Sequence, residues 1–310
     1  MRILVTGADG FVGGCLLPRL AAAGHEVIAT ARPASDGHRA EAASWIPLEL
    51  DDPESIAGAL AEPVDAIVHL AAVASNAEAR RDPGRAWSVN AAGTARLAAA
   101  AAALKDAGGH DPLFLLVSSG EVYGSGPPVP RREDEPVRPQ SPYAASKAGA
   151  ELAVLETGRR TGLRVIVVRP FQHTGPAQSN RYVVPALARR LLEARAAGQR
   201  TVRTGSLEPV RDILDVRDVV DAYLLLLERG VPGTIYNVAR GEGVALRDLF
   251  DRLAALAGVD ARPEPDPALM RTADVPWLVG DPSLLHAATG WRPALTLEQT
   301  LKDVVDAQAH

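Results

Sequence analysis

Continuous apolar runs alternate with longer amphipathic stretches over the first 170 residues of the chain. The runs are rich in Val, Ile and Leu with few intervening polar residues, which is typical of strands buried on both faces of a parallel sheet. We expect strands at 2–6, 25–31, 45–50, 65–72, 112–119 and 163–170. We expect helices at 11–24, 52–60, 86–105 and 141–160. This alternation predicts an α/β fold with a doubly wound parallel sheet of the Rossmann type.

The pattern becomes irregular after Pro170. Helices are predicted at 182–198, 217–230, 244–258, 281–289 and 296–308, and short strands at 210–216 and 234–239. A proline-rich stretch, 262–277, interrupts them, and this part is too short for a second enzyme domain. We therefore expect a Rossmann domain in residues 1–170. Residues 171–310 are expected to form mostly a smaller α/β lobe over the carboxyl ends of the strands, with some segments returning to the sheet.

Composition and charge narrow the class of protein. Of the 310 residues, 47% are hydrophobic and 23% are charged, which is typical of soluble globular proteins. The net charge of −5 offers no basic face to nucleic acid or to an anionic membrane. No apolar run approaches the roughly 20 residues of a membrane span, and we expect no signal peptide before the first strand.

The cysteine and histidine content also narrows the class of protein. Cys15 is the single cysteine, and the seven histidines have no H-x-x-x-H spacing, so we expect no disulfide and no metal site. We predict a soluble, cytoplasmic protein.

A glycine-rich turn, TGADGFVGG (6–14), joins the first strand to the first helix. Glycines at 7, 10 and 13 would allow a tight turn, close approach of the backbone to a pyrophosphate, and close packing of helix on strand. The N-terminus of the following helix favours phosphate. We therefore predict that residues 1–170 bind a dinucleotide, with contacts from Gly7, Gly10, Phe11, Val12 and Gly13.

The end of the second strand bears on the choice between NAD and NADP. Proteins that prefer NAD usually carry an acid there, but this strand ends in Thr30, Ala31 and Arg32, and the first acid is Asp36. A guanidinium suits a 2′-phosphate. We predict NADP(H) in preference to NAD(H), with Arg32 at the phosphate; the alternative is that Arg32 is a solvated loop residue.

Candidate catalytic residues follow the fifth strand. SSGEVYG (118–124) places Ser118, Ser119 and Glu121 at the carboxyl edge of the sheet, beside the cofactor crevice. Tyr143 and Lys147 lie one turn apart on the next helix and share a face. A free phenol has a pKa near 10, so we expect the Lys147 ammonium to stabilise the phenolate and allow proton exchange at neutral pH. Hydride would move to or from the nicotinamide while Tyr143 donates or accepts the proton.

Together these motifs resemble the extended short-chain dehydrogenase/reductase superfamily, the NAD-dependent epimerases and dehydratases. The resemblance is carried by TGADGFVG, HLAA (69–72), SVNAAGT (88–94), SSGEVYG, YAASK (143–147) and RPFQHTGP (169–176). It implies a Ser–Tyr–Lys triad of Ser119, Tyr143 and Lys147, in which Lys147 also holds the nicotinamide ribose. It further implies cofactor contacts or support from Leu50, Asp51, Leu70, Ala71, Ala72, Asn90 and Pro170.

The C-terminal part resembles members of the superfamily that act on nucleotide-diphosphate sugars, most of all the GDP-4-keto-6-deoxy-mannose reductases. The resemblance implies NADPH-dependent reduction of the sugar 4-keto group, with GDP-D-rhamnose as product. Arg211 and Arg271 would clamp the diphosphate with their guanidinium forks, the alternative being surface arginines paired with Asp212 or Asp274. The other implied substrate contacts are Ser118, Ser119, Gln172, His173, Asn180, Val184 and Asp274. The family usually has Asn where this chain has Gln172.

Glu121 leaves a 4,6-dehydratase or a 4-epimerase open, because the Glu of this motif is the base at sugar C5 in related dehydratases. Related 4-keto reductases also carry Glu here, and the mannose dehydratases typically have TGxxGQDG where this chain has TGADGFVG. A non-catalytic NADP-binding regulator is the remaining alternative, although such proteins tend to lose the tyrosine or the lysine. By family analogy, the helices at 86–105 and 141–160 would pair in a homodimer.

Overall fold

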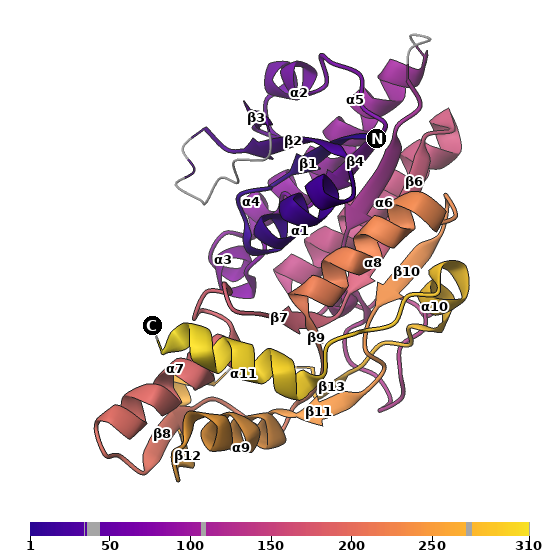
Figure 1. Ribbon diagram of the computed structural model, residues 1–310. Helices are drawn as coiled ribbons and strands as arrows, with labels where there is room; N and C mark the ends of the chain where they lie inside the picture. Colours follow the sequence, from indigo (N-terminus) through magenta and orange to yellow (C-terminus); the bar gives the residue numbers. More distant parts are fainter. Residues whose placement is uncertain (34, 36–43, 107–109, 271–274, 310) are drawn as a thin grey trace.

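A parallel sheet forms the centre of the larger half of the molecule (Figure 1). The computed structural model describes residues 1–310 except 34, 36–43, 107–109, 271–274 and 310. Within these residues the sheet has seven strands, in the order β10 (Ile235–Val238), β6 (Arg164–Pro170), β5 (Leu113–Val117), β4 (Ala66–His69), β1 (Arg2–Thr6), β2 (Glu26–Ala31) and β3 (Ser44–Pro47). The winding reverses between β1 and β4, and open α/β sheets generally bind ligands beyond the strand ends at such a point. The predicted doubly wound α/β fold is confirmed.

Helices cover both faces of the sheet (Figure 1). One face packs on α1 (Phe11–Ala22) and α8 (Val216–Arg229). The other packs on α2 (Pro53–Ala59), α5 (Thr94–Asp106) and α6 (Pro142–Thr161). Ile3 and Val5 belong to the first core and Leu4 to the second, because successive strand side chains point to opposite faces. Burial on both faces explains why the strands are apolar throughout.

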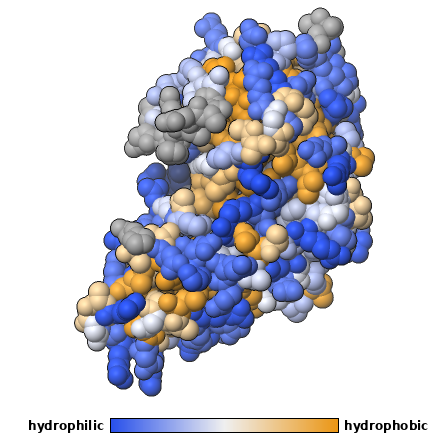
Figure 2. All heavy atoms as spheres, in the orientation of Figure 1, coloured by the Kyte–Doolittle hydropathy of each residue, from blue (hydrophilic) through white to orange (hydrophobic). Residues whose placement is uncertain are grey.

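A smaller lobe lies beyond the carboxyl ends of these strands (Figure 1). It contains the short strands β7 (Gln172–Thr174), β9 (Val210–Asp215), β11 (Gly243–Ala245) and β13 (Trp277–Leu278), and the pair β8 (Thr201–Thr204) and β12 (Arg262–Pro265). Helices α7 (Val183–Ala196), α9 (Leu246–Ala257) and α11 (Leu297–Gln308) enclose its separate core. In Figure 2 the lobe exposes hydrophilic residues along its lower edge and hydrophobic residues on the face that is shown. Although they follow Pro170, α8 and β10 belong to the larger half.

Several elements differ from the sequence-based expectations. The expected helix 86–105 is divided into α4 (Pro83–Trp87), a π-helical segment, Ser88–Gly93, and α5. Helix α3 (Asn76–Arg81) was not predicted, and neither was β12, which pairs in parallel with β8 inside the proline-rich stretch. Helix α10 (Ser283–Thr289) contacts β10 and α8. Among the helices of the described chain, none is both long and apolar enough to cross a membrane.

Candidate active site

The glycine turn brings β1, α1 and the segment after β4 into close contact. Gly7 has φ +64°, a conformation that favours glycine, and a Cβ there would lie 2.7 Å from the Cα of Ala71. A Cβ on Gly13 would lie 2.2 Å from the carbonyl oxygen of Ala8. Any side chain at Gly7 or Gly13 would therefore push these segments apart.

Gly10 is less crowded than Gly7 and Gly13. A Cβ there would meet only the carbonyl oxygen of Gly7, 3.3 Å away, among the atoms of the described residues. Helix α1 begins at Phe11, and no described side chain caps its N-terminus. Backbone N–H groups at a helix start next to an open glycine position are a suitable cradle for a pyrophosphate. The residues present therefore fit the predicted dinucleotide.

The carboxyl end of β2 offers polar groups on the same side. The Thr30 hydroxyl is buried and has no hydrogen-bond partner among the described residues. Arg32 is exposed directly after the strand, and the Ser35 hydroxyl donates a hydrogen bond to Asp9 in the glycine turn. This contact ties the segment after β2 to the phosphate cradle. Asp36 lies outside the described residues.

Helix α6 presents the predicted Tyr–Lys pair. Ser141 caps its start by accepting a hydrogen bond from a first-turn N–H at 3.1 Å, Pro142 occupies the first helical position, and Gly162 ends the helix with φ 72°. These local signals fix where the helix begins and ends. As a result Tyr143 lies in the first turn and Lys147 one turn later.

The Tyr143 ring packs against the apolar cluster of Val73, Ala79 and Ala86. Burial raises the pKa of the Tyr143 phenol, the Glu121 charge raises it further, and a hydrogen-bonding contact with the Ser119 hydroxyl acts against both. The predicted net increase in the acidity of this phenol is therefore wrong for this structure, because desolvation and the Glu121 charge outweigh any stabilisation of the phenolate by Lys147. The phenol is protonated at neutral pH.

Lys147 is buried, and its Nζ donates a hydrogen bond to the carbonyl oxygen of Val117 at 2.7 Å. Burial lowers the pKa of Lys147 to about 8, and the nearby Glu151 carboxylate acts in the opposite direction. Lys147 thus sits at the carboxyl end of β5, between the catalytic helix and the sheet. A cation here can also hold a ligand hydroxyl.

Ser119 and Glu121 lie beside Tyr143. Ser119 caps a short 3₁₀ helix, Gly120–Tyr123, and its side chain accepts a hydrogen bond from the Glu121 N–H at 3.2 Å. Both Glu121 carboxylate oxygens accept hydrogen bonds from Nδ2 of Asn76, at 2.8 and 3.1 Å. The sequence analysis missed Asn76, because α3 had not been predicted and the residue belongs to no motif.

Asn90 supports the site instead of facing the cofactor. Its Oδ1 accepts from the N–H of Val73 at 2.7 Å, and its Nδ2 donates to the Val73 carbonyl oxygen and to the Ser146 hydroxyl. Asn90 is buried in the π-helical segment, and its amide is occupied by these contacts. These contacts agree with the supporting role that the resemblance implies for Asn90, which links the segment after β4 to α6.

The predicted pair Leu50 and Asp51 lies before α2. The Leu50 side chain is buried and would be 2.8 Å from a Cβ on Gly93, so it packs directly on the π-helical segment. Asp51 accepts hydrogen bonds from Ser88 at 2.9 Å and Arg96 at 3.1 Å. These contacts hold the segment after β3 against the start of α5.

The predicted segment Leu70–Ala72 follows β4, next to the glycine turn. The N–H of Leu70 donates to the Thr6 carbonyl oxygen at 3.2 Å, and the N–H of Ala71 donates to the Thr6 hydroxyl at 3.1 Å. Ala71 and Ala72 remain partly exposed. Pro170 is buried at the end of β6. All of these residues lie at carboxyl ends of strands, as expected for a cofactor crevice.

Gln172 and His173 lead from the sheet into the lobe. The Gln172 Oε1 is buried without a partner among the described residues, so a polar acceptor is available here. The His173 ring stacks on Phe11 with centroids 6.3 Å apart, and its Nδ1 lies 2.9 Å from the Phe171 carbonyl oxygen. Burial lowers the pKa of His173. This pair connects the glycine turn to the predicted substrate side.

Two predicted substrate contacts are placed elsewhere. The Ser118 hydroxyl is buried and donates to the Glu151 carboxylate, on the α6 side of β5. Val184 is buried in the core of the lobe. Neither side chain is available to a ligand, so we correct both predictions. Asn180 is exposed before α7.

Of the two arginines predicted to clamp the diphosphate, the structure describes only Arg211. Arg211 lies in β9, is 7% exposed, and its Nη1 donates to the Val210 carbonyl oxygen at 2.8 Å, so it is not a surface arginine. Asp212 is buried and caps backbone N–H groups of neighbouring loops; burial raises its pKa to about 6. Arg271 and Asp274 lie outside the described residues.

A buried charged network lies between α6 and β6. Arg169 makes two hydrogen bonds to the Glu151 carboxylate, at 3.0 and 2.7 Å, and a third to the Tyr123 hydroxyl at 2.9 Å. The Tyr123 hydroxyl donates to Asn237 at 2.8 Å. These contacts connect α6, β6 and β10. Because Glu151 also acts on Lys147, the network joins the fold to the catalytic pair.

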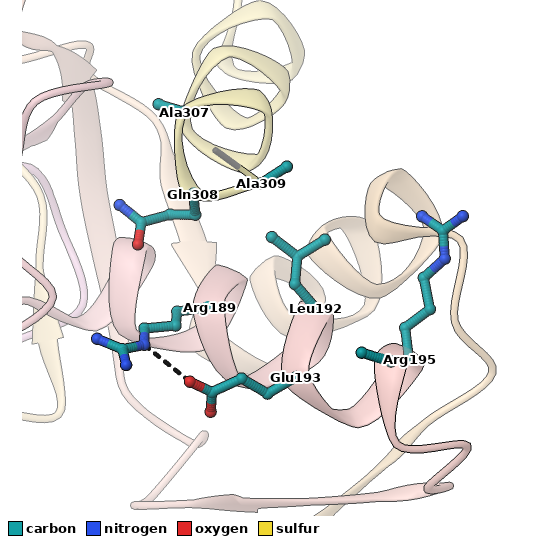
Figure 3. Close-up of a pocket in the computed structure, with 8 residues that line it drawn as sticks. Arg189, Leu192, Glu193, Arg195, Ala307, Gln308 and Ala309 are labelled. Carbon is teal, nitrogen blue, oxygen red and sulfur yellow. Dashed lines mark hydrogen bonds and ion pairs between the residues drawn. The ribbon is translucent and has the colours of Figure 1, made fainter.

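The large cavity drawn in Figure 3 is not part of this site. It measures about 710 Å³ and lies between α7 and the end of α11. Its polar lining includes the Arg189–Glu193 ion pair, with N and O atoms 2.8 Å apart. No predicted catalytic residue lines it.

Comparisons with known proteins identify related sequences and structures. The sequence pattern of the NAD dependent epimerase/dehydratase family matches residues 3–239. The chain is 38% identical over 309 residues to the GDP-6-deoxy-D-mannose reductase of Pseudomonas aeruginosa, covering 98% of this chain and 96% of that protein. It resembles the structure of RMD from Pseudomonas aeruginosa complexed with NADPH, with a TM-score of 0.85, 36% identity and 99% of both chains covered. For the UDP-glucose 4-epimerase of Thermotoga maritima with UDP-glucose, the TM-score is 0.90 and the identity 30%, with 99% of this chain and 98% of that chain covered.

Proposed function

Since the chain belongs to the NAD dependent epimerase/dehydratase family, we propose that it is an NADPH-dependent reductase of nucleotide-diphosphate 6-deoxy-4-keto sugars. The proposed substrate is GDP-4-keto-6-deoxy-D-mannose and the product is GDP-D-rhamnose. One observation carries the proposal: a protonated Tyr143 phenol in contact with Ser119, with Lys147 one turn away. Similarity over nearly the whole length of a GDP-6-deoxy-D-mannose reductase supports it.

The reduction needs a hydride at sugar C4 and a proton at the ketone oxygen. The dinucleotide, when bound, supplies the hydride. Ser119 would donate a hydrogen bond to the ketone oxygen and hold it near Tyr143. Tyr143 would give its proton to that oxygen as the alkoxide develops, and its raised pKa keeps it in the required acid form. Lys147, in its protonated form, would stabilise the phenolate that remains.

The cofactor preference and the assembly are part of the same proposal. We infer NADP(H) from Arg32 at the end of β2, and the RMD structure complexed with NADPH supports this choice. We infer a homodimer through the helical region 86–105 and α6, because Trp87 at the end of α4 is 47% exposed beside Gly149 and Leu152 on α6 is 67% exposed. The cytoplasmic location stays a prediction.

A 4,6-dehydratase or 4-epimerase is the second candidate. Glu121 favours the dehydratase, because two hydrogen bonds from Asn76 hold its carboxylate next to Tyr143. The likeness to a UDP-glucose 4-epimerase favours the epimerase.

Absorbance at the nicotinamide band separates these functions. Purified protein with NADPH and GDP-4-keto-6-deoxy-D-mannose should oxidise NADPH. Conversion of GDP-mannose without net NADPH consumption would identify a dehydratase. Interconversion of UDP-glucose and UDP-galactose would identify a 4-epimerase. Tight NADPH binding without any turnover would identify a regulator.

A further inference from the structure

Asn76 is the first residue of α3, a helix that Ser75 caps by accepting a hydrogen bond from the Glu78 N–H at 3.3 Å. Its Nδ2 bridges both carboxylate oxygens of Glu121. Only the nitrogen can donate to a carboxylate, so this contact fixes which end of the amide faces Glu121. The Oδ1 of Asn76 is consequently turned away from the carboxylate. It is buried and has no hydrogen-bond partner within the described residues.

A buried carbonyl oxygen without a donor is unusual in a folded protein. Buried polar side-chain atoms nearly always have a partner, and leaving one unpaired destabilises the fold. Glu121 connects Asn76 to Ser119 and Tyr143. Its backbone N–H donates a hydrogen bond to the Ser119 hydroxyl, and its charge acts on the Tyr143 phenol. Asn76 is therefore connected through Glu121 to the proposed reacting centre.

The chemistry of the pair selects the ligand group. The Asn76 Oδ1 can accept hydrogen bonds but cannot donate them, and the same is true of the Glu121 carboxylate. Phosphate oxygens would be repelled by such a pair, whereas hydroxyl groups of a sugar ring can donate to it. We propose that Asn76 is a specificity-determining residue, which holds Glu121 through Nδ2 and accepts a hydrogen bond through Oδ1 from a hydroxyl of the hexose of a nucleotide-diphosphate sugar. This inference rests on the proposed function.

Calorimetric binding of GDP-mannose and GDP tests the proposal without catalysis. Both ligands carry the nucleoside diphosphate, and only GDP-mannose carries the hexose. Asn76→Val should weaken GDP-mannose about tenfold, as expected for about 1.4 kcal/mol, and leave GDP and NADPH unchanged. Ala77→Val is the matched control, because it places the same residue at an exposed neighbouring position of α3 and should leave all three affinities unchanged.

A double-variant cycle separates direct contact from an effect through Glu121. If Oδ1 contacts the sugar, Asn76→Val should still weaken GDP-mannose in a Glu121→Ala background. The proposal is overturned if GDP-mannose binds Asn76→Val as tightly as the unaltered protein, or if the loss disappears when Glu121 is absent. If the unaltered protein binds neither GDP ligand, the proposed nucleotide is wrong, and UDP-glucose against UDP provides the same comparison for Asn76.

Discussion

Because Lys147 is buried, we expect activity to fall as the pH rises through the lowered pKa of its ammonium. Its pKa is lowered to about 8, because the ammonium loses water and keeps one carbonyl partner, Val117, with Glu151 nearby. At that pKa, about a tenth of the Lys147 side chains are neutral at pH 7 and about nine-tenths at pH 9. If the ammonium is needed, kcat/KM for NADPH should fall about tenfold between these pH values, because this parameter reports ionisations of the free enzyme.

Glu151→Gln perturbs this pH dependence in a defined direction. The Glu151 carboxylate favours the Lys147 ammonium, so its removal should move the basic limb of kcat/KM to lower pH. The single variant also leaves the buried Arg169 without its anion, at a cost of about 3–5 kcal/mol in the free energy of unfolding. The double variant Glu151→Gln/Arg169→Met removes that unpaired charge and should show the same shifted limb with better stability.

The assay is initial-rate NADPH oxidation as a function of pH, with the thermal midpoint measured for each variant. Glu156→Gln is the control, since Glu156 lies on the same helix, is exposed and pairs with Arg160. It should leave the limb in place. A limb at the same pH in the unaltered protein and in both Glu151 variants would refute the electrostatic link. The absence of any basic limb up to about pH 10 would refute the burial argument itself.

Three further substitutions test other parts of the site. Tyr143→Phe should lower turnover by about 10²–10⁴ with NADPH affinity nearly unchanged, and near-normal rates would remove Tyr143 as the acid. Gly13→Ala should lower the thermal midpoint and NADPH affinity, because its Cβ would lie 2.2 Å from a backbone oxygen. Gly14→Ala places its Cβ more than 4 Å from every described atom outside its chain neighbours and the backbone of its own helix, and should stabilise α1 by up to about 1 kcal/mol. Equal effects of the two substitutions would contradict this packing argument. Arg32→Ala should weaken NADPH roughly 10–100-fold and NADH much less, and equal losses in the two dissociation constants would discard Arg32 as the phosphate-binding residue.

The sequence by itself determined the features that depend on neighbours along the chain. Unbroken Val, Ile and Leu runs identified strands buried on both faces, and the cap at Ser141 together with Gly162 set the limits of the catalytic helix. The glycine spacing identified the phosphate turn, because conformation and close packing there tolerate no side chain at Gly7 or Gly13. These signals are local, so one segment suffices to recognise each of them.

Tertiary structure decided which groups meet across long separations, and how much water they lose. Asn76 and Glu121 are 45 residues apart, and α3 gave no signal strong enough to predict their contact. The same holds for the parallel pairing of β8 with β12. The acidity of Tyr143 was predicted in the wrong direction, because spacing on a helix shows that Lys147 is near but not that burial outweighs it. Desolvation depends on every element packed around a group, and only the assembled fold contains that information.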